Sequence, residues 1–190
     1  EIRGSGRDKD VPLLFLHGFM GSSRDWAETL EQLPEYRCIV VDLPAHGLSA
    51  GCSADLYSMP RTTLALLAVL DELRLGHCVP VGYSMGGRLA LNLALAHPDR
   101  CRALVVESGS PGLASDRERE SRREWDETKA RELEQQGLDG FLEAWYRQPL
   151  FHSIRRNQAR FASLIERRRQ NNIAGLALSL RLMGTGSQEP

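Results

Sequence analysis

One serine of this sequence lies between glycines in an order that suits a nucleophile. The residues Gly82-Tyr83-Ser84-Met85-Gly86 follow the apolar run 79–81 and precede the helix-forming run 89–94. This order predicts a strand, a sharp turn and a helix, with Ser84 in a strained backbone conformation and its hydroxyl above a sheet. Glycine at positions 82 and 86 lets strand and helix approach closely. The alternative is an ordinary serine in a glycine-rich turn, and the motifs described below weigh against it.

A serine hydroxyl becomes reactive when a histidine takes its proton and a carboxylate orients that histidine. In a strand–serine–helix arrangement of this kind both partners follow the serine, the acid first. The sequence offers only His97 and His152 after Ser84. His97 ends the helix after the turn, and His152 has no acid at a strand end before it, which leaves His152 as a remote alternative. The triad aspartate and histidine are therefore expected to be absent from these 190 residues.

The loop after the first predicted strand supplies another part of such a site. His17-Gly18-Phe19 follows that strand directly. The backbone N–H groups of Phe19 and Met85 are therefore predicted to hold an oxyanion. His17 and His46 each precede a glycine in a turn, so we expect them to fix loop structure and not to transfer protons.

Short apolar runs alternate with helical segments in the first part of the chain. Strands are predicted at 11–16, 37–42, 77–82 and 102–107, and helices at 24–33, 59–75 and from the serine turn to 96. Residues 1–10 are predicted to be no more than a frayed lead-in. This alternation is typical of an α/β fold, a parallel sheet with helices on both faces. Ligands bind beyond the carboxyl ends of such strands, where the sequence places His17, His46, Ser84 and Ser110.

From residue 113 onward the sequence predicts only helical segments. They cover 114–136, 138–146, a stretch ending at 169, and 173–183, and they are rich in arginine and glutamate. We interpret residues 113–190 as an all-helical cap over the active edge of a core formed by residues 1–112. The alternative is a set of solvated helices whose charges keep them soluble.

Composition narrows the classes of partner. The formal net charge of −1 gives no basic field for nucleic acid, and no apolar stretch approaches the 18 residues that a membrane span needs. The four cysteines are far apart and lack CxxC spacing, which predicts free thiols in a reducing cytosol, hence a cytoplasmic protein, and no metal site. The sequence leaves the oligomeric state open.

Three motifs taken together resemble the α/β-hydrolase superfamily: Leu16-His17-Gly18-Phe19, Asp42-Leu43-Pro44-Ala45-His46-Gly47 and Gly82-Tyr83-Ser84-Met85-Gly86-Gly87. Further segments at 87–88, 107–113, 145–151 and 179–186 resemble the 2-succinyl-6-hydroxy-2,4-cyclohexadiene-1-carboxylate synthase family of menaquinone biosynthesis. The resemblance implies an α/β-hydrolase fold and a lyase that eliminates pyruvate from a small polycarboxylate, without a metal or an organic cofactor. It also implies that the triad serine relays a proton and is not acylated.

The resemblance assigns roles to single residues. Ser84 matches the triad serine, and Phe19 and Met85 match the oxyanion donors. The matching substrate contacts are Tyr83, Arg88, Arg122, Trp145 and Arg168. Arginines suit this role because a guanidinium binds a carboxylate through two parallel hydrogen bonds. The alternatives are Arg167 or Arg169 in place of Arg168, a solvated Arg122, and a Trp145 that only packs.

The chain departs from the family pattern at two points. Ala45 stands where the family usually has glycine, which bears on the backbone freedom of that turn. The family continues past the cap with strands that carry the triad aspartate and histidine, so we expect an incomplete sequence with little or no turnover. A degenerate, inactive paralogue is the alternative.

Two other functions stay open: a carboxylesterase or thioesterase, and a non-catalytic module that binds carboxylates.

Overall fold

A computed structural model describes residues 2–3 and 11–188 of the chain. Its sheet has the strand order β1-β3-β2-β4-β5. The strands are β1 (Ile2–Arg3), β2 (Leu13–Leu16), β3 (Cys38–Val41), β4 (Val79–Tyr83) and β5 (Val105–Glu107). β2 to β5 run parallel, whereas β1 pairs antiparallel with β3. The expectation that the first ten residues form no element is therefore wrong for Ile2–Arg3, and the sheet is not purely parallel.

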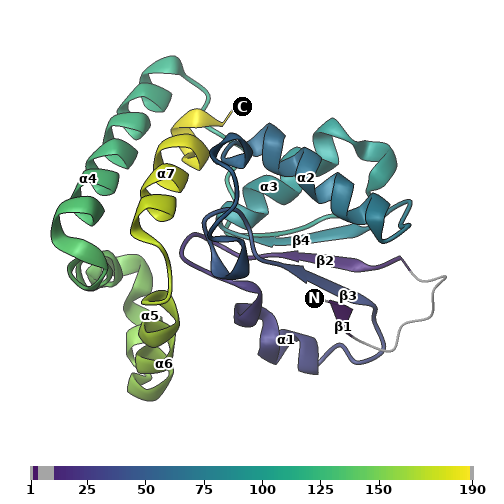
Figure 1. Ribbon diagram of the computed structural model, residues 1–190, viewed down its shortest axis with the longest axis horizontal. Helices are drawn as coiled ribbons and strands as arrows, with labels where there is room; N and C mark the ends of the chain where they lie inside the picture. Colours follow the sequence, from purple (N-terminus) through teal and green to yellow (C-terminus); the bar gives the residue numbers. More distant parts are fainter. Residues whose placement is uncertain (1, 4–10, 189–190) are drawn as a thin grey trace.

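Helices cover both faces of this sheet (Figure 1). α1 (Ala27–Glu31) lies on one face, and α2 (Met59–Glu72) and α3 (Met85–Ala96) lie on the other. Alternate residues of β2 serve the two faces: Leu14 and Leu16 pack under α2 and α3, whereas Phe15 packs with Trp26 on the α1 side. Both faces of the strand are buried, which explains why it reads as an unbroken apolar run.

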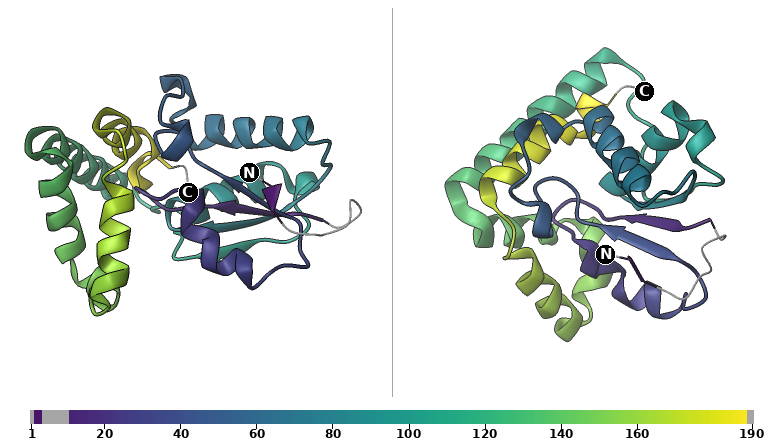
Figure 2. Two further views of the ribbon diagram at one scale, coloured as in Figure 1. Left: turned by 60° about the horizontal axis from the view of Figure 1, so that its bottom comes forward. Right: turned by 45° about the vertical axis from the view of Figure 1, so that its right-hand side comes forward.

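The last part of the described chain is entirely helical (Figure 2). α4 (Asp116–Arg147) is followed by α5 (His152–Arg155), α6 (Gln158–Arg168) and α7 (Ile173–Met183). α4 is broken at Gly137, whose φ of 73° lies in the left-handed region that favours glycine. The break separates the two segments that the sequence predicts at 114–136 and 138–146. Short 3-10 turns fill the connections at Ser23–Trp26, Gly47–Ser49, Ala54–Leu56, Pro98–Arg100, Pro149–Phe151 and Thr185–Ser187.

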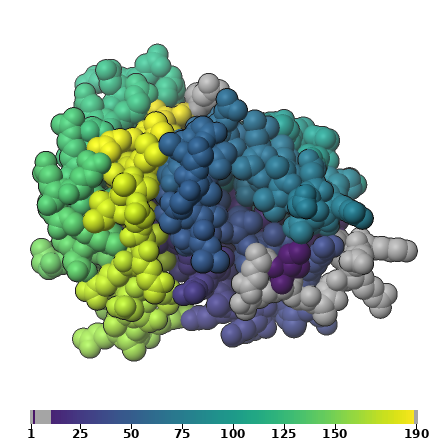
Figure 3. Space-filling view, viewed as in Figure 1, coloured from purple at the N-terminus to yellow at the C-terminus, as the bar shows by residue number. Residues whose placement is uncertain are grey.

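α7 connects the helical part to the sheet part. It packs along α4, and Met183 at its end belongs to the core cluster under α2 and α3. At its start Gly175 lies against Ala45 and the Tyr57 hydroxyl, so closely that a Cβ there would be 3.2 Å from the Ala45 Cβ. Figure 3 shows α7 beside this segment of the core. Of the helices in the described ranges, none has the length and apolarity to cross a bilayer.

Candidate active site

Ser84 lies in a sharp turn between β4 and α3. Its φ of 53° and ψ of −112° are a strained pair for a residue with a side chain, and its N–H donates to the Glu107 carbonyl at 2.9 Å. The two flanking glycines are sterically required. A Cβ at Gly82 would lie 2.2 Å from the Gly86 carbonyl oxygen, and one at Gly86 would lie 2.1 Å from the Leu16 carbonyl oxygen. The local geometry is thus the strand, turn and helix that the sequence predicts.

The loop after β2 lies directly against this turn. A Cβ at Gly18 would be 3.3 Å from the Ser84 Cβ and 2.9 Å from the Tyr83 ring. Met85 is the first residue of α3, where backbone N–H groups have no partner inside the helix. Within the described part of the chain, neither the Phe19 nor the Met85 N–H donates a backbone hydrogen bond. Both N–H groups are therefore available to an acceptor.

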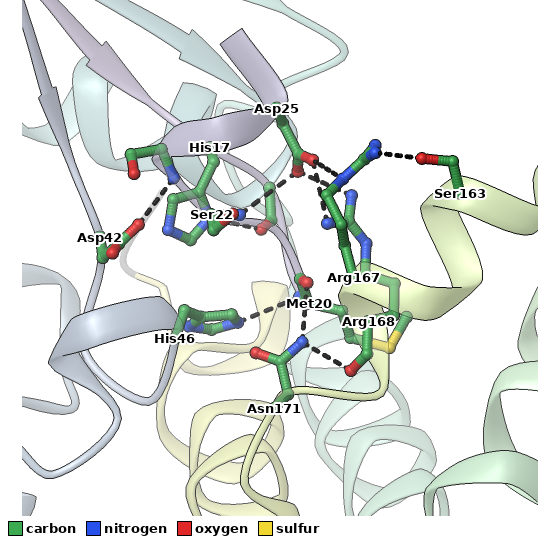
Figure 4. Close-up of polar contacts among 12 residues, drawn as sticks. His17, Met20, Ser22, Asp25, Asp42, His46, Ser163, Arg167, Arg168 and Asn171 are labelled. Carbon is green, nitrogen blue, oxygen red and sulfur yellow. Dashed lines mark hydrogen bonds and ion pairs between the residues drawn. The ribbon is translucent and has the colours of Figure 1, made fainter. Parts of the chain in front are cut away.

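His17 and His46 hold this loop in place (Figure 4). The His17 Nε2 accepts from the Leu43 N–H at 3.0 Å, and the His46 Nε2 accepts from the Met20 N–H at 3.0 Å. Each Nδ1 contacts a backbone carbonyl at 2.8 Å, that of Gly18 for His17 and that of Pro44 for His46. Burial lowers the pKa of both rings, that of His46 to about 3, so both stay neutral. The expectation that they fix loop structure is confirmed.

Ala45 has a φ of +77° and is fully buried, next to His46. This left-handed conformation suits glycine, which accounts for the glycine that the resemblance expects at this position. Alanine in place of glycine therefore strains the backbone at this one residue and leaves the turn intact.

Trp145 belongs to an aromatic group that reaches the loop. Its ring centroid lies 5.4 Å from that of Phe19, 5.4 Å from that of Phe141 and 6.0 Å from that of Trp125. The structure thus places Trp145 next to a candidate oxyanion donor. Tyr83, beside Ser84, is 40% exposed.

Arg122 pairs with the buried carboxylate of Asp126, whose charge also acts on Arg88. The Arg122 Nε donates to Asp126 Oδ1 at 3.0 Å, and the Arg122 guanidinium lies 4.7 Å above the Trp125 ring. Burial, and next the charge of Arg122, lower the pKa of Arg88 to about 10, while Asp126 acts in the opposite direction. An open hollow of about 540 Å³ adjoins Arg122 and Trp125. This corner therefore offers space and positive charge to an anionic ligand.

Arg88 links α3, the helix that follows Ser84, to the end of α7. It is 8% exposed, and its Nη2 donates to the Met183 carbonyl at 2.7 Å. Its Nη1 donates to Gln188 Oε1 at 3.4 Å. Two of its N–H groups are therefore used inside the chain. Arg88 adds positive charge to the site, but its guanidinium is only partly available to a ligand.

Arg168 makes its contacts with a different partner (Figure 4). Its Nη1 and Nη2 donate to Asp25 Oδ1 and Oδ2 at 3.1 and 2.7 Å, and its Nε donates to the Tyr146 hydroxyl at 3.3 Å. Arg167 Nε also approaches Asp25 Oδ1, at 3.6 Å. Among the described residues the polar contacts of Arg168 do not include Arg88 or Arg122. Its guanidinium ties α6 to the turn before α1.

Sequence reasoning missed Asp25, Asp126 and Tyr146. Asp126 follows Arg122 by four residues on one helix, a spacing that favours an ion pair and could have identified it. Asp25 is separated from Arg168 by 143 residues, and no local pattern predicts such a contact.

No described residue supplies a base to Ser84. Its hydroxyl makes no hydrogen bond within residues 2–3 and 11–188, and both ring nitrogens of His17 and of His46 are in use. His97 caps the end of α3, and His152 is exposed at the start of α5. Among the same residues no three His, Cys, Asp or Glu side chains are grouped so that they could hold a metal ion.

Comparisons with known proteins agree on one family. The family described as alpha/beta hydrolase fold matches residues 11–178. The 2-succinyl-6-hydroxy-2,4-cyclohexadiene-1-carboxylate synthase of Enterobacter sp. (strain 638) is 36% identical over 94% of this chain and 67% of its own length. The synthase of the same name from Klebsiella pneumoniae (strain ATCC 700721 / MGH 78578) is 34% identical over 93% of this chain and 68% of its own. The solved structure of MenH from S. aureus has a TM-score of 0.92 and 30% identity, and the match covers 100% of this chain and 72% of that one.

Proposed function

We propose a function for this chain from its family: it belongs to the α/β-hydrolase fold family and, within it, to the 2-succinyl-6-hydroxy-2,4-cyclohexadiene-1-carboxylate synthases. The proposed reaction is a step of menaquinone biosynthesis. It eliminates pyruvate from 2-succinyl-5-enolpyruvyl-6-hydroxy-3-cyclohexene-1-carboxylate and leaves the cyclohexadiene carboxylate of the family name. The substrate is a small molecule with three carboxylates.

The reaction is a proton abstraction followed by loss of an oxygen leaving group. A base removes the proton from ring carbon 2, next to the succinyl ketone. The electron pair forms the 2,3 double bond, the 3,4 double bond shifts to 4,5, and the bond from carbon 5 to the enolpyruvyl oxygen breaks. The released enolpyruvate takes up a proton and becomes pyruvate. Negative charge develops on the ketone oxygen, which is the position that an oxyanion hole stabilises.

Ser84 is the proposed proton relay. One observation carries this assignment: Ser84 lies in a strained turn against which the loop after β2 packs, and the N–H groups of Phe19 and Met85, one in that loop and one next to Ser84, donate no backbone hydrogen bond. A ketone oxygen held by these donors would bring its neighbouring carbon toward the Ser84 Oγ. A relay needs a further group to take the serine proton, and the described histidines do not provide it. We therefore expect the 190-residue polypeptide to release little pyruvate unaided.

Of the three arginines proposed to bind substrate, Arg122 has the most exposed guanidinium. Its side chain is 39% exposed and opens onto the hollow beside Trp125. Arg88 adds positive charge behind it, and Tyr83 and Trp145 are proposed to contact the ring of the substrate. Arg168 can bind a substrate carboxylate only in competition with Asp25, because that carboxylate already occupies its fork.

Calorimetric titration of the chain with the tricarboxylate substrate tests the binding part of this proposal. We expect Arg122→Gln to weaken binding by about tenfold to a hundredfold, since a charge-assisted hydrogen bond contributes roughly 1.5–3 kcal/mol. Arg131→Gln is the matched control, an exposed arginine about two and a half turns further along α4, and should leave binding unchanged. Absence of binding to the unaltered chain, or equal loss in both variants, would overturn the proposal.

A carboxylesterase or thioesterase would use the same turn and the same N–H groups. It differs in one respect, because Ser84 would carry an acyl group during turnover. With imidazole added as the base that the described histidines do not supply, incubation with 4-nitrophenyl butyrate followed by mass spectrometry separates the two: the lyase leaves Ser84 unmodified, and an esterase adds a butyryl group. A module that only binds carboxylates would bind the tricarboxylate and stay silent in every activity assay.

A further inference from the structure

A second pocket lies within the helical part of the chain. Its volume is about 470 Å³, and it lies between the second half of α4 and the α5–α6 pair. Leu142, Tyr146, Phe161 and Ile165 form an apolar, partly aromatic floor. We call it the cap pocket. Its size falls in the range of sites for small organic ligands, roughly 300–1,000 Å³.

The charges around the cap pocket do not cancel. Arg147 pairs with Glu143 at 2.5 Å, and Arg169 pairs with Asp139 at 2.6 Å. Arg155 also lines the pocket and has no ion pair with any described residue. Its Nε is buried and has no hydrogen-bond partner in that same part of the chain. A buried donor without a partner is costly, so this atom marks a place where an acceptor would be stabilising.

The cap pocket is separate from the Ser84 site. On the second half of α4, Phe141 and Trp145 point to the aromatic group that contains Phe19, whereas Leu142 and Tyr146 lie on a different face and line the cap pocket. None of Ser84, Phe19 and Met85 lines it. The Tyr146 hydroxyl accepts a hydrogen bond from Arg168, so the cap pocket adjoins the contact that ties α6 to the turn before α1.

We propose that the cap pocket binds an amphipathic organic monoanion, an aryl or alkyl carboxylate or sulfonate. The anionic group would accept hydrogen bonds from the Arg155 guanidinium, including the buried Nε, and the apolar body would cover the floor. One anionic group suffices, since the other two arginines of the rim are already neutralised. Occupancy would brace α4 against α6 next to the Tyr146–Arg168 contact.

The probe for this proposal is 8-anilinonaphthalene-1-sulfonate, an aromatic monoanion whose fluorescence rises on binding. Titrated into the full chain, it should bind about tenfold more weakly to Arg155→Gln, as expected for loss of a charge-assisted contact. Arg155→Lys, which keeps the charge, should restore part of the affinity. Arg156→Gln removes the adjacent, exposed arginine and should leave the affinity unchanged. The uncharged N-phenyl-1-naphthylamine should bind equally to all four proteins.

Two controls keep this test independent of the catalytic proposal. Ser84→Ala should bind the probe like the unaltered chain, because Ser84 does not line the cap pocket. Far-UV circular dichroism checks that each variant is folded. Equal probe affinity in Arg155→Gln and the unaltered chain would overturn the proposal, as would an equal loss in Arg156→Gln. Either result would mean that the probe binds another surface or that only water meets the buried Nε.

Discussion

The ion pair between Asp25 and Arg168 is predicted to fasten α6 to the sheet part of the chain. It joins residues 143 positions apart through two parallel hydrogen bonds, and the Tyr146 hydroxyl adds a third contact to the same guanidinium. The side chains are 9% exposed for Arg168 and 22% for Asp25. Solvent therefore weakens this pair far less than an ion pair on the surface. The perturbation is Asp25→Asn, which keeps the shape and removes the charge.

The magnitude follows from what the change leaves behind. Removing one partner of a buried pair costs about 3–5 kcal/mol, because the remaining charge is buried without compensation. Asp25 retains some contact with water, so we expect Asp25→Asn to lower the free energy of unfolding by about 2–3 kcal/mol. Arg168→Gln should lower it by a similar amount. The double variant should cost little more than either one, which corresponds to a coupling energy of about 2 kcal/mol.

Urea unfolding followed by circular dichroism measures these free energies. The control is the pair of Glu28 and Arg160, which joins the same two parts of the chain with side chains that are 75% and 65% exposed. Its coupling energy should stay below about 1 kcal/mol and shrink further in 0.5 M salt. If the two pairs show equal coupling energies, or if the Asp25–Arg168 coupling vanishes in salt, the structural reasoning is refuted.

Three further changes test the scaffold of the site. Gly86→Ala should cost about 3 kcal/mol or more, because its Cβ would lie 2.1 Å from the Leu16 carbonyl oxygen, while Gly76→Ala, with open space around it, should change stability by less than about 0.5 kcal/mol. Equal effects in thermal melts would contradict the close approach. Ala45→Gly should raise stability by up to about 1 kcal/mol, since relief of the left-handed strain, about 1–2 kcal/mol, exceeds the roughly 0.8 kcal/mol lost with the buried methyl; a fall in the urea midpoint would be the opposite result. Acidification should destabilise the chain, because the pKa of His46 is lowered to about 3 in the folded state and the unfolded state therefore takes up the proton first. The free energy of unfolding is highest above pH 6.5 and falls as the pH drops toward 3. Between pH 6.5 and 5 this loss is about 2 kcal/mol, with His17 acting in the same direction, and unfolding free energies that are equal at pH 7 and pH 5 would exclude it.

The sequence identifies the parts of this molecule that depend on neighbours along the chain. The turn at Ser84, the helix 173–183 and the break at Gly137 follow from local glycine placement and apolar periodicity, and the structure confirms them. The position of the loop after β2 against Ser84 could be predicted because parallel strands bring their carboxyl ends to one edge, whereas its role as an oxyanion hole stays a prediction. The division into a core of residues 1–112 and a cap of residues 113–190 stays a prediction.

Contacts between distant segments could not be predicted. The partner of Arg168 lies before α1, and the partner of Arg88 is a carbonyl at the end of α7. In both cases the residue type indicates a carboxylate or carbonyl partner and leaves its position undetermined. The pairing of Ile2–Arg3 with β3 was missed for the same reason, because two residues carry no periodicity and only the neighbouring strand orders them.

Pyruvate release in the presence of added imidazole tests the central role of Ser84 most directly. Imidazole can take the place of a base that the described histidines do not supply, and coupling to lactate dehydrogenase reports pyruvate as it forms. We predict that imidazole raises pyruvate release from the tricarboxylate in the unaltered chain and in Ser110→Ala, a serine at the same sheet edge, and that Ser84→Ala abolishes the increase. The same imidazole-dependent rate in Ser84→Ala and the unaltered chain would contradict the assignment of Ser84 as the proton relay.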